Sequence, residues 1–219
     1  MFHIKFLFSR ALRIPYRIRI WWYTYWNRFV FWLNGVKFGN NMRIHNCVYL
    51  RMHNRAKLII GDEFTFSSGA AINPLCRNIK GCIYLPEESS VLEIGNQSGI
   101  SSACIWAKER ITIGNRVLIG GDCILLDTDA HNLDYHIRAS KDLIGKISMD
   151  CFTAKSKPIV IEDDVLIGTR CIILKGVTIG ARTIIGSGSV VTKSIPADCI
   201  AAGNPCQVIK SNNDENLIH

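Results

Sequence analysis

Residues 161–192 read Ile161-Glu-Asp-Asp-Val-Leu, Ile167-Gly-Thr-Arg-Cys-Ile, Ile173-Leu-Lys-Gly-Val-Thr, Ile179-Gly-Ala-Arg-Thr-Ile, Ile185-Gly-Ser-Gly-Ser-Val and Val191-Thr. Ile or Val opens every hexamer, and a small or β-branched residue follows four positions later. Apolar residues recur every two positions in a half-exposed strand and every 3.6 positions in an amphipathic helix. A sustained period of six therefore indicates neither an isolated half-exposed strand nor an amphipathic helix. The period predicts that three short strands make a triangular turn of about eighteen residues, and that turns stack as parallel sheets.

The same register recurs upstream, which sets the extent of the predicted fold. Copies begin at Ile113 and Ile94, with a weaker one at Ile60. We therefore predict an all-β, left-handed parallel β-helix over residues 37–203, preceded by a basic aromatic helical segment (1–36) and followed by a C-terminal tail (204–219). Residues 132–158 are polar and lack the repeat, so they are expected to leave the prism as a loop. Long excursions on repeat scaffolds usually carry function.

The N-terminal segment concentrates the positive charge. Residues 1–34 hold Lys5, Arg10, Arg13, Arg17, Arg19 and Arg28, many aromatic residues and no acidic residue. Arginines interrupt each apolar run before the ~18 residues that a bilayer crossing needs, and no signal-peptide pattern is present. Two interpretations stay open: an amphipathic helix in a membrane interface, or a helix packed on its own protein or a sister subunit. Nucleic-acid binding is not expected, because the basic character ends with this segment.

The nine cysteines are scattered, with neither a CxxC pair nor a histidine at zinc-finger spacing. A reduced, cytoplasmic protein is the expectation. Several cysteines occupy the small-residue position of the hexamer, which favours packing over metal ligation. No metal site is predicted.

Chemistry is concentrated just before the excursion, at Asp127-Thr128-Asp129-Ala130-His131. A histidine can take the proton of an alcohol as the alcohol attacks a carbonyl. A carboxylate within reach can fix the tautomer of the ring and stabilise the imidazolium. We therefore interpret His131 as a general base, with Asp127 and Asp129 as its candidate carboxylate partners.

The chain resembles the hexapeptide-repeat acetyltransferases over residues 92–210, in particular the maltose, galactoside and capsular-polysaccharide O-acetyltransferase branch. The matching motifs are Ile119-Gly120-Gly121, Asp127 to His131, Lys157-Pro158, Lys175 to Gly180, Gly188 to Lys193 and Gly203-Asn204-Pro205.

The resemblance implies an acetyl-CoA-dependent O-acetyltransferase that acts on a sugar hydroxyl of a polysaccharide or glycolipid precursor, without a metal. It further implies a homotrimer with active sites between neighbouring prisms, and His131 as the base. The family's oxyanion donor falls on Thr169. Its pantetheine contacts fall on Ser187 and Thr192, and the basic positions near the CoA phosphates fall on Lys193 and Lys210.

Acceptor contacts are expected from Ser101 and Ser102, which match polar positions of relatives, and from Arg138 in the excursion. Relatives often carry an aromatic residue where this chain has Ala130, a change expected to open the acceptor side. The main alternative is an N-acetyltransferase acting on an amino sugar nucleotide. Less favoured are a zinc lyase that uses His131 and His136, and a non-catalytic scaffold. The expected location is the cytoplasm, including the inner face of the membrane.

Overall fold

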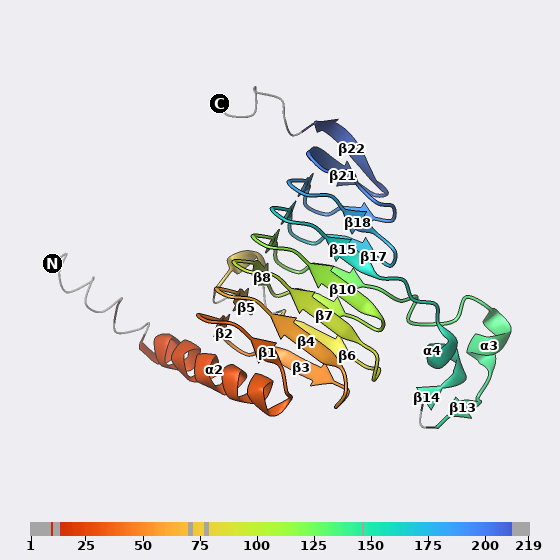
Figure 1. Cartoon of the computed structure of the whole chain (residues 1–219), viewed down its shortest axis with the longest axis horizontal. Coiled ribbons are helices and arrows are strands. Elements are labelled where there is room, and N and C mark those ends of the chain that lie inside the picture. The colour runs from red at the N-terminus through yellow and green to blue at the C-terminus, as the bar shows by residue number, and fades with distance from the viewer. Residues whose placement is uncertain (1–9, 11–13, 70–71, 77–78, 146, 212–219) are drawn as a thin grey trace.

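The structure, a computed structural model, describes residue 10 and residues 14–69, 72–76, 79–145 and 147–211. Its body is a three-sided prism of stacked coils, with a helix at the N-terminal end and an arm of short elements projecting from one edge (Figure 1). The strands of each side pair in parallel, except for β22 at the C-terminal end of one side. The predicted left-handed parallel β-helix with an N-terminal helix and a long excursion is confirmed.

Within each coil the chain runs along three sides in turn, which we call A, B and C. Side A holds β1 (Lys37–Phe38), β4 (Lys57–Ile60), β7 (Val91–Ile94), β10 (Arg110–Ile113), β15 (Ile159–Ile161) and β18 (Thr178–Ile179). Side B holds β2 (Arg43–His45), β5 (Thr65–Ser67), β8 (Gly99–Ser101), β11 (Leu118–Ile119), β16 (Leu166–Ile167), β19 (Ile184–Ile185), β21 (Cys199–Gly203) and β22 (Cys206–Ser211). Side C holds β3 (Tyr49–Met52), β6 (Cys82–Leu85), β9 (Cys104–Trp106), β12 (Ile124–Leu126), β17 (Ile172–Leu174) and β20 (Val190–Val191).

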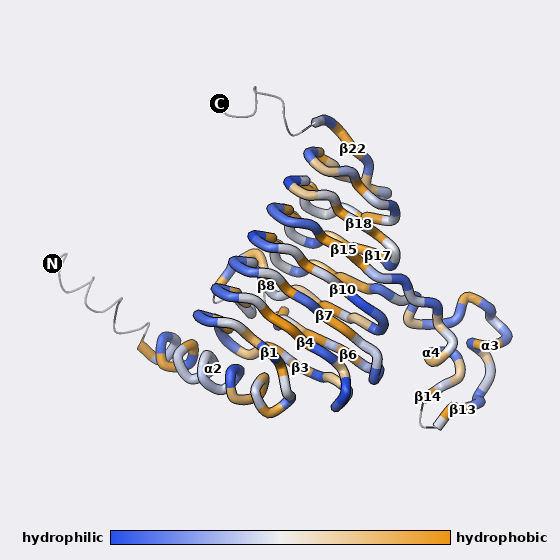
Figure 2. Tube along the Cα trace, in the orientation of Figure 1, coloured by the Kyte–Doolittle hydropathy of each residue, from blue (hydrophilic) through white to orange (hydrophobic). Residues whose placement is uncertain are grey.

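The core is a stack of aliphatic side chains that the first position of each hexamer turns inward. Ile113 is the register partner of Ile161 on side A, and Ile119 is the partner of Ile167 on side B. All four are buried, and each contributes roughly 1.5–3 kcal/mol by leaving water. Apolar segments therefore recur at the same place in each coil (Figure 2). The small-residue positions are buried at the corners, and all nine cysteines are free thiols.

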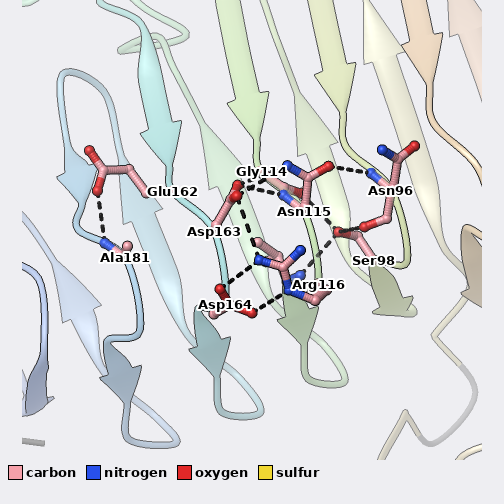
Figure 3. Close-up of polar contacts among 10 residues, drawn as sticks. Asn96, Ser98, Gly114, Asn115, Arg116, Glu162, Asp163, Asp164 and Ala181 are labelled. Atoms are coloured by element: carbon pink, nitrogen blue, oxygen red, sulfur yellow. Dashed lines mark hydrogen bonds and ion pairs between the residues drawn. The ribbon is translucent and has the colours of Figure 1, made fainter. Parts of the chain in front are cut away.

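Asparagine and aspartate side chains form a hydrogen-bonded ladder at the corner between sides A and B (Figure 3). The Asn96 backbone N–H donates to Asn115 Oδ1 at 2.9 Å, and the Asn115 N–H donates to Asp163 Oδ1 at 2.8 Å. A Cβ added to Gly114 would lie 2.5 Å from Asp163 Oδ1, so this stacking requires glycine. The ladder fixes the register of each coil on the next.

Two segments leave the prism. One contains α3 (Tyr135–Ala139), β13 (Leu143–Ile144), β14 (Ile147–Ser148) and α4 (Met149–Thr153), within the excursion expected at 132–158. The other lies between β5 and β6 and includes the 3₁₀ turn η1 (Pro74–Cys76), which no pattern in the sequence predicted. Ser68 holds the base of this second excursion: its Oγ accepts the Gly81 N–H at 2.9 Å and donates to Cys47 O.

Helix α2 (Ile14–Leu33) closes the N-terminal end of the prism. Phe31 and Asn27 are its buried residues, and Asn27 Nδ2 donates to Asn46 O at 2.7 Å. Most of the remaining aromatic side chains of the helix are exposed. Within the described part of the chain, no helix has the length and hydropathy needed to cross a membrane. Residues 1–9 and 11–13 of the expected N-terminal segment, and 212–219 of the expected tail, lie outside the described residues, whereas Cys206–Ser211 form β22.

Candidate active site

The excursion is closed at its base by antiparallel contacts between its two ends. Thr128 forms an isolated antiparallel bridge with Ser156. The Asp129 N–H donates to Lys155 O, and the Lys157 N–H donates to Asp127 O, both at 2.9 Å. The chain therefore leaves and rejoins the prism at one place, and His131 stands just beyond this closure.

His131 is paired with a carboxylate from the far end of the excursion. Its Nδ1 lies 2.5 Å from Asp150 Oδ2, and Asp150 Oδ1 accepts the Asn132 backbone N–H at 2.7 Å. The hydrogen bond to His131 holds the pKa of the Asp150 carboxyl below its usual range. Because an ionised carboxylate only accepts hydrogen bonds, Nδ1 carries the proton, and the Nε2 lone pair is free to take one. The imidazole itself is exposed.

Asp150 is held by α4, and Lys108 anchors α4. Lys108 Nζ donates to the carbonyl oxygens of Cys151, Phe152 and Ala154 at 2.7, 3.1 and 3.1 Å. These carbonyls end the helix, where a cation offsets the negative end of the peptide dipoles. Lys108 therefore ties the helix that carries Asp150 to the third coil of the prism.

The two carboxylates predicted from sequence lie elsewhere. Asp127 is fully buried and accepts the backbone N–H groups of Lys108, Glu109 and Arg110 at 2.7–2.8 Å. Burial raises the pKa of the Asp127 carboxyl even though these three N–H groups lower it. Asp129 Oδ2 pairs instead with Lys175 Nζ at 2.9 Å. The structure thus places Asp150 at the imidazole in place of both, because the turn to His131 directs Asp127 inward and Asp129 toward the next coil.

Thr169 and Ser187, predicted to contact CoA, stack on adjacent coils at the corner between sides B and C. The Thr169 N–H donates to Ser187 Oγ at 3.1 Å. A Cβ on Gly168 would lie 2.5 Å from the Ser187 nitrogen, which explains the glycine. Both residues line a cavity of about 540 Å³ along side B, together with Ser101. The predicted oxyanion donor is therefore already paired with a hydroxyl.

The remaining predicted CoA contacts lie apart from this corner. Thr192 and Lys193 follow β20 and are exposed, and Lys210 is exposed on β22. His131 follows β12, whereas Thr169 precedes β17, so the strands of side C separate the two. A single chain does not bring the predicted base and the predicted oxyanion donor together.

Two of the three residues predicted to contact the acceptor instead form hydrogen bonds within the fold. Ser102 is buried, and its Oγ accepts the Gly69 N–H at 2.7 Å. Arg138 Nη1 donates to Asn132 O and Leu133 O at 2.7 and 2.8 Å, so it braces the excursion. Neither hydrogen-bonding pattern was visible in the sequence, because both depend on how the two excursions fold back.

The described residues hold one group with donor atoms close enough to suggest a metal: His131, Asp150 and Cys151, within 4.8 Å of one another. Two ligands on one tetrahedral zinc lie roughly 3.3 Å apart, given bond lengths near 2.0–2.1 Å. The 2.5 Å between His131 Nδ1 and Asp150 Oδ2 is shorter and fits a shared proton. His136 is the second histidine of the zinc-lyase alternative, and its ring packs against Tyr135, with the ring centroids 3.9 Å apart.

Known proteins share the six-residue repeat of this chain. The sequence model of the bacterial transferase hexapeptide (six repeats) family matches residues 158–193. Over these coils the chain is therefore similar to the hexapeptide-repeat transferases. This hexapeptide-repeat protein is 38% identical over 104 residues to galactoside O-acetyltransferase of Escherichia coli strain K12, covering 48% of the chain and 45% of the relative.

A second relative is named as an N-acetyltransferase. The chain is 42% identical over 76 residues to a 2,3,4,5-tetrahydropyridine-2,6-dicarboxylate N-acetyltransferase of Staphylococcus aureus strain Newman, covering 35% of the chain and 30% of the relative. A galactoside acetyltransferase solved in complex with coenzyme A matches with a TM-score of 0.51 and 26% identity, covering 82% of this chain and 66% of that one. The hexapeptide-repeat protein spans less than half the length of these two curated relatives.

Proposed function

We propose that this protein transfers an acetyl group from acetyl-CoA to a sugar hydroxyl, in a polysaccharide or glycolipid precursor, with His131 as general base. The observation that carries the proposal is the exposed imidazole whose Nδ1 is held by buried Asp150. His131 Nε2 takes the acceptor proton as the acceptor oxygen attacks the thioester carbonyl. The C–S bond then breaks, and the imidazolium returns the proton to the CoA sulfur.

The relatives support an acyl transfer and leave the acceptor atom open. One relative is a galactoside O-acetyltransferase and another an N-acetyltransferase, so amine acetylation stays the alternative. The decisive experiment is a mass-spectrometric screen of sugars and amino sugars with acetyl-CoA, repeated with His131→Ala. Acetyl esters are lost under mild alkali and amides persist, so this treatment distinguishes the two products. An acceptor that gains acetyl equally with both proteins would contradict the proposed base.

The faces of the prism support a trimer whose sites are shared between subunits. The outward residues of side A include charged Lys57, Glu93 and Arg110, whereas Leu118 on side B and Ile124 on side C are exposed apolar residues. In a ring, one copy places side B against side C of the next. That arrangement would bring the Thr169 corner of one subunit to the base of its neighbour.

Subunit complementation tests this arrangement. We expect His131→Ala and Gly168→Val homotrimers each to be inactive, because one lacks the base and the other has a deformed Thr169 corner. Unfolding the two together and refolding them should restore a fraction of the activity, since mixed trimers contain some intact interfaces. Separately refolded samples combined afterwards are the control. No recovery from trimers that native mass spectrometry shows to be mixed would contradict a shared site.

The proposed reaction uses acetyl-CoA as co-substrate and requires no metal, since imidazole and carboxylate together supply the base. The CoA track would include Thr169, Ser187 and Thr192, with Lys193 and Lys210 near the phosphates. Dialysis against a chelator should leave turnover unchanged. If dialysis abolished turnover and stoichiometric zinc restored it, His131, Asp150 and Cys151 would instead be interpreted as metal ligands.

We further propose a cytoplasmic protein that docks peripherally on the membrane through α2. The outward face of the helix exposes Trp22, Trp26 and Phe29, with Arg19 and Arg28 also exposed. Aromatic rings at headgroup depth with arginines beside anionic lipid are typical of an interfacial helix.

Flotation with vesicles tests the docking. The double variant Trp22→Ser, Trp26→Ser should lose binding to phosphatidylserine-containing vesicles and keep turnover on a soluble acceptor. Vesicles of phosphatidylcholine alone are the control for charge. If the variant instead changes the oligomeric state and wild type ignores the vesicles, the helix packs on a sister subunit.

A further inference from the structure

A second cavity, of about 570 Å³, lies at the base of the long excursion, beside the His131–Asp150 pair. Its lining includes the ends of β3, β6 and β9 on side C, and Ile147 from the excursion. Ala130 and Cys151 also line it, and they are the chain neighbours of His131 and Asp150. Its size falls within the ~300–1,000 Å³ usual for small-molecule sites.

Two aromatic side chains form one wall of this cavity. Tyr84 on β6 and Trp106 on β9 are register partners, with ring centroids 5.2 Å apart. Both belong to the outward face of side C, so the hydrophobic core of the prism does not account for them. The Trp106 Nε1 is buried, so the part of the indole that meets the cavity is carbon. We call this pair the aromatic platform.

Polar groups stand around the aromatic platform. The Arg51 guanidinium lies 5.2 Å from the Tyr84 ring centroid, and Glu87 lines the same cavity. Among the described residues, the structure gives no salt bridge or hydrogen bond to the Arg51 guanidinium or the Glu87 carboxylate. His53 Nδ1 accepts the Arg55 N–H at 3.2 Å, which leaves Nε2 as a donor. Donors and an acceptor thus surround an apolar floor.

We propose that this cavity is the acceptor subsite and that it holds a pyranose ring of a glycan. A pyranose has an apolar face of C–H groups and a rim of hydroxyls. The aromatic platform would stack against the apolar face of the sugar, and Arg51, His53 and Glu87 would form hydrogen bonds with the hydroxyls of its rim. An acyl chain would leave these charged groups unpaired, which disfavours a purely apolar ligand. The proposal rests on the proposed function, because it makes the ring the carrier of the hydroxyl that His131 deprotonates.

The placement also explains the small residue before His131. Ala130 lines the cavity and has φ of +61°, a conformation that costs a non-glycine residue roughly 1 kcal/mol or more. A larger side chain at this position would project from the same backbone into the cavity region. In the proposed trimer the Thr169 corner comes from the neighbouring subunit, so CoA and acceptor would approach His131 from separate directions.

Kinetics with a sugar acceptor identified by the screen test the subsite. Tyr84→Ala and Trp106→Leu should each raise the acceptor KM about three- to tenfold, the loss expected for a stacked aromatic contact. The KM for acetyl-CoA should stay within twofold. Tyr49→Ala is the matched control, because Tyr49 lies on the same face of side C, in the same strand as Arg51 but outside the cavity lining. It should leave both constants unchanged.

Binding without turnover separates this inference from the proposed function. Saturation-transfer NMR should show sugar protons in contact with the wild-type protein in the absence of acetyl-CoA, and the signal should disappear in Tyr84→Ala. Should the aromatic variants fold poorly, Arg51→Gln with Glu87→Gln gives the same test through the rim. Sugar that binds but is never acetylated would overturn the function and keep the subsite. Unchanged acceptor KM in both aromatic variants, no glycan bound by wild type, or nucleoside bound in place of glycan would overturn the subsite.

Discussion

Replacing Asp150 with asparagine would test the assignment of the base most directly. The amide keeps the size of the carboxylate, and its oxygen can still accept the Asn132 N–H that Oδ1 accepts at 2.7 Å. Its NH₂ group then faces His131 Nδ1, where Oδ2 lay at 2.5 Å. A donor at that place makes Nδ1 the acceptor, so the proton moves to Nε2 and the base is blocked.

The expected loss follows from what a general base contributes. With the wrong tautomer we expect kcat to fall about 10²–10⁴-fold, which is roughly 2.7–5.5 kcal/mol of transition-state stabilisation. The KM for acetyl-CoA should stay near its wild-type value, since Asp150 contacts His131 and Asn132 and none of the residues proposed for the CoA track. The assay is acetyl transfer to the sugar identified by the screen, followed by mass spectrometry.

Asp129→Asn is the control for this experiment. It removes the ion pair with Lys175 but leaves the His131–Asp150 contact in place. We expect its kcat to fall by less than about tenfold, since an ion pair of this kind supports the loop without touching the imidazole. If Asp150→Asn retained wild-type kcat while Asp129→Asn lost activity, Asp129 would be the partner of the base and the reasoning above would be refuted.

Further substitutions address stability, the oxyanion donor and acid sensitivity. Asp127→Asn should lose at least one of three backbone hydrogen bonds to a buried carboxylate, about 1.5–3 kcal/mol, and lower the thermal midpoint by roughly 3–12 °C; an unchanged midpoint in calorimetry would contradict this. Ser187→Ala should free the Thr169 N–H and keep or raise kcat at saturating acetyl-CoA, and a large drop in that kcat would contradict the oxyanion role of this N–H. The hydrogen bond from Arg116 lowers the pKa of Asp164, so this pair stabilises the fold above about pH 4 and loses that effect as the pH falls through the lowered pKa. The urea midpoints of Asp164→Asn and wild type should therefore differ at pH 7, and the difference should shrink progressively below about pH 4.

The period of six was sufficient to predict the fold because each repeat position has one physical role. The first residue of each hexamer points inward, as Ile161 and Ile167 do, and a glycine follows where coils stack too closely for a Cβ, as at Gly168. These requirements recur in every coil, so they leave a signal in the sequence. The excursion after β5 escaped prediction because the weak repeat at residue 60 runs directly into it without a polar stretch of comparable length.

The partner of His131 could not be predicted, because no local pattern marks it. Asp150 lies 19 residues from His131 in sequence and reaches it only because α4 folds back over the base of the excursion. Asp127 and Asp129 were the nearer carboxylates, yet the chain turns sharply through Ala130 and directs both away from the ring. Proximity in sequence is a poor guide at a tight turn, since consecutive side chains then point in different directions.

Asp127 nevertheless supports the site, through the stacking of coils. Its buried carboxylate binds the turn that begins at Lys108, one coil below in the prism. The Lys108 ammonium binds the last carbonyls of α4, and α4 carries Asp150 to His131. The first two links are hydrogen bonds to backbone, and the last joins the Asp150 carboxylate to the His131 ring. The Asp-Thr-Asp motif next to the histidine therefore acts on the imidazole indirectly, and its loss should affect stability and the orientation of the base together, whereas loss of Asp150 should affect the base with little change in stability.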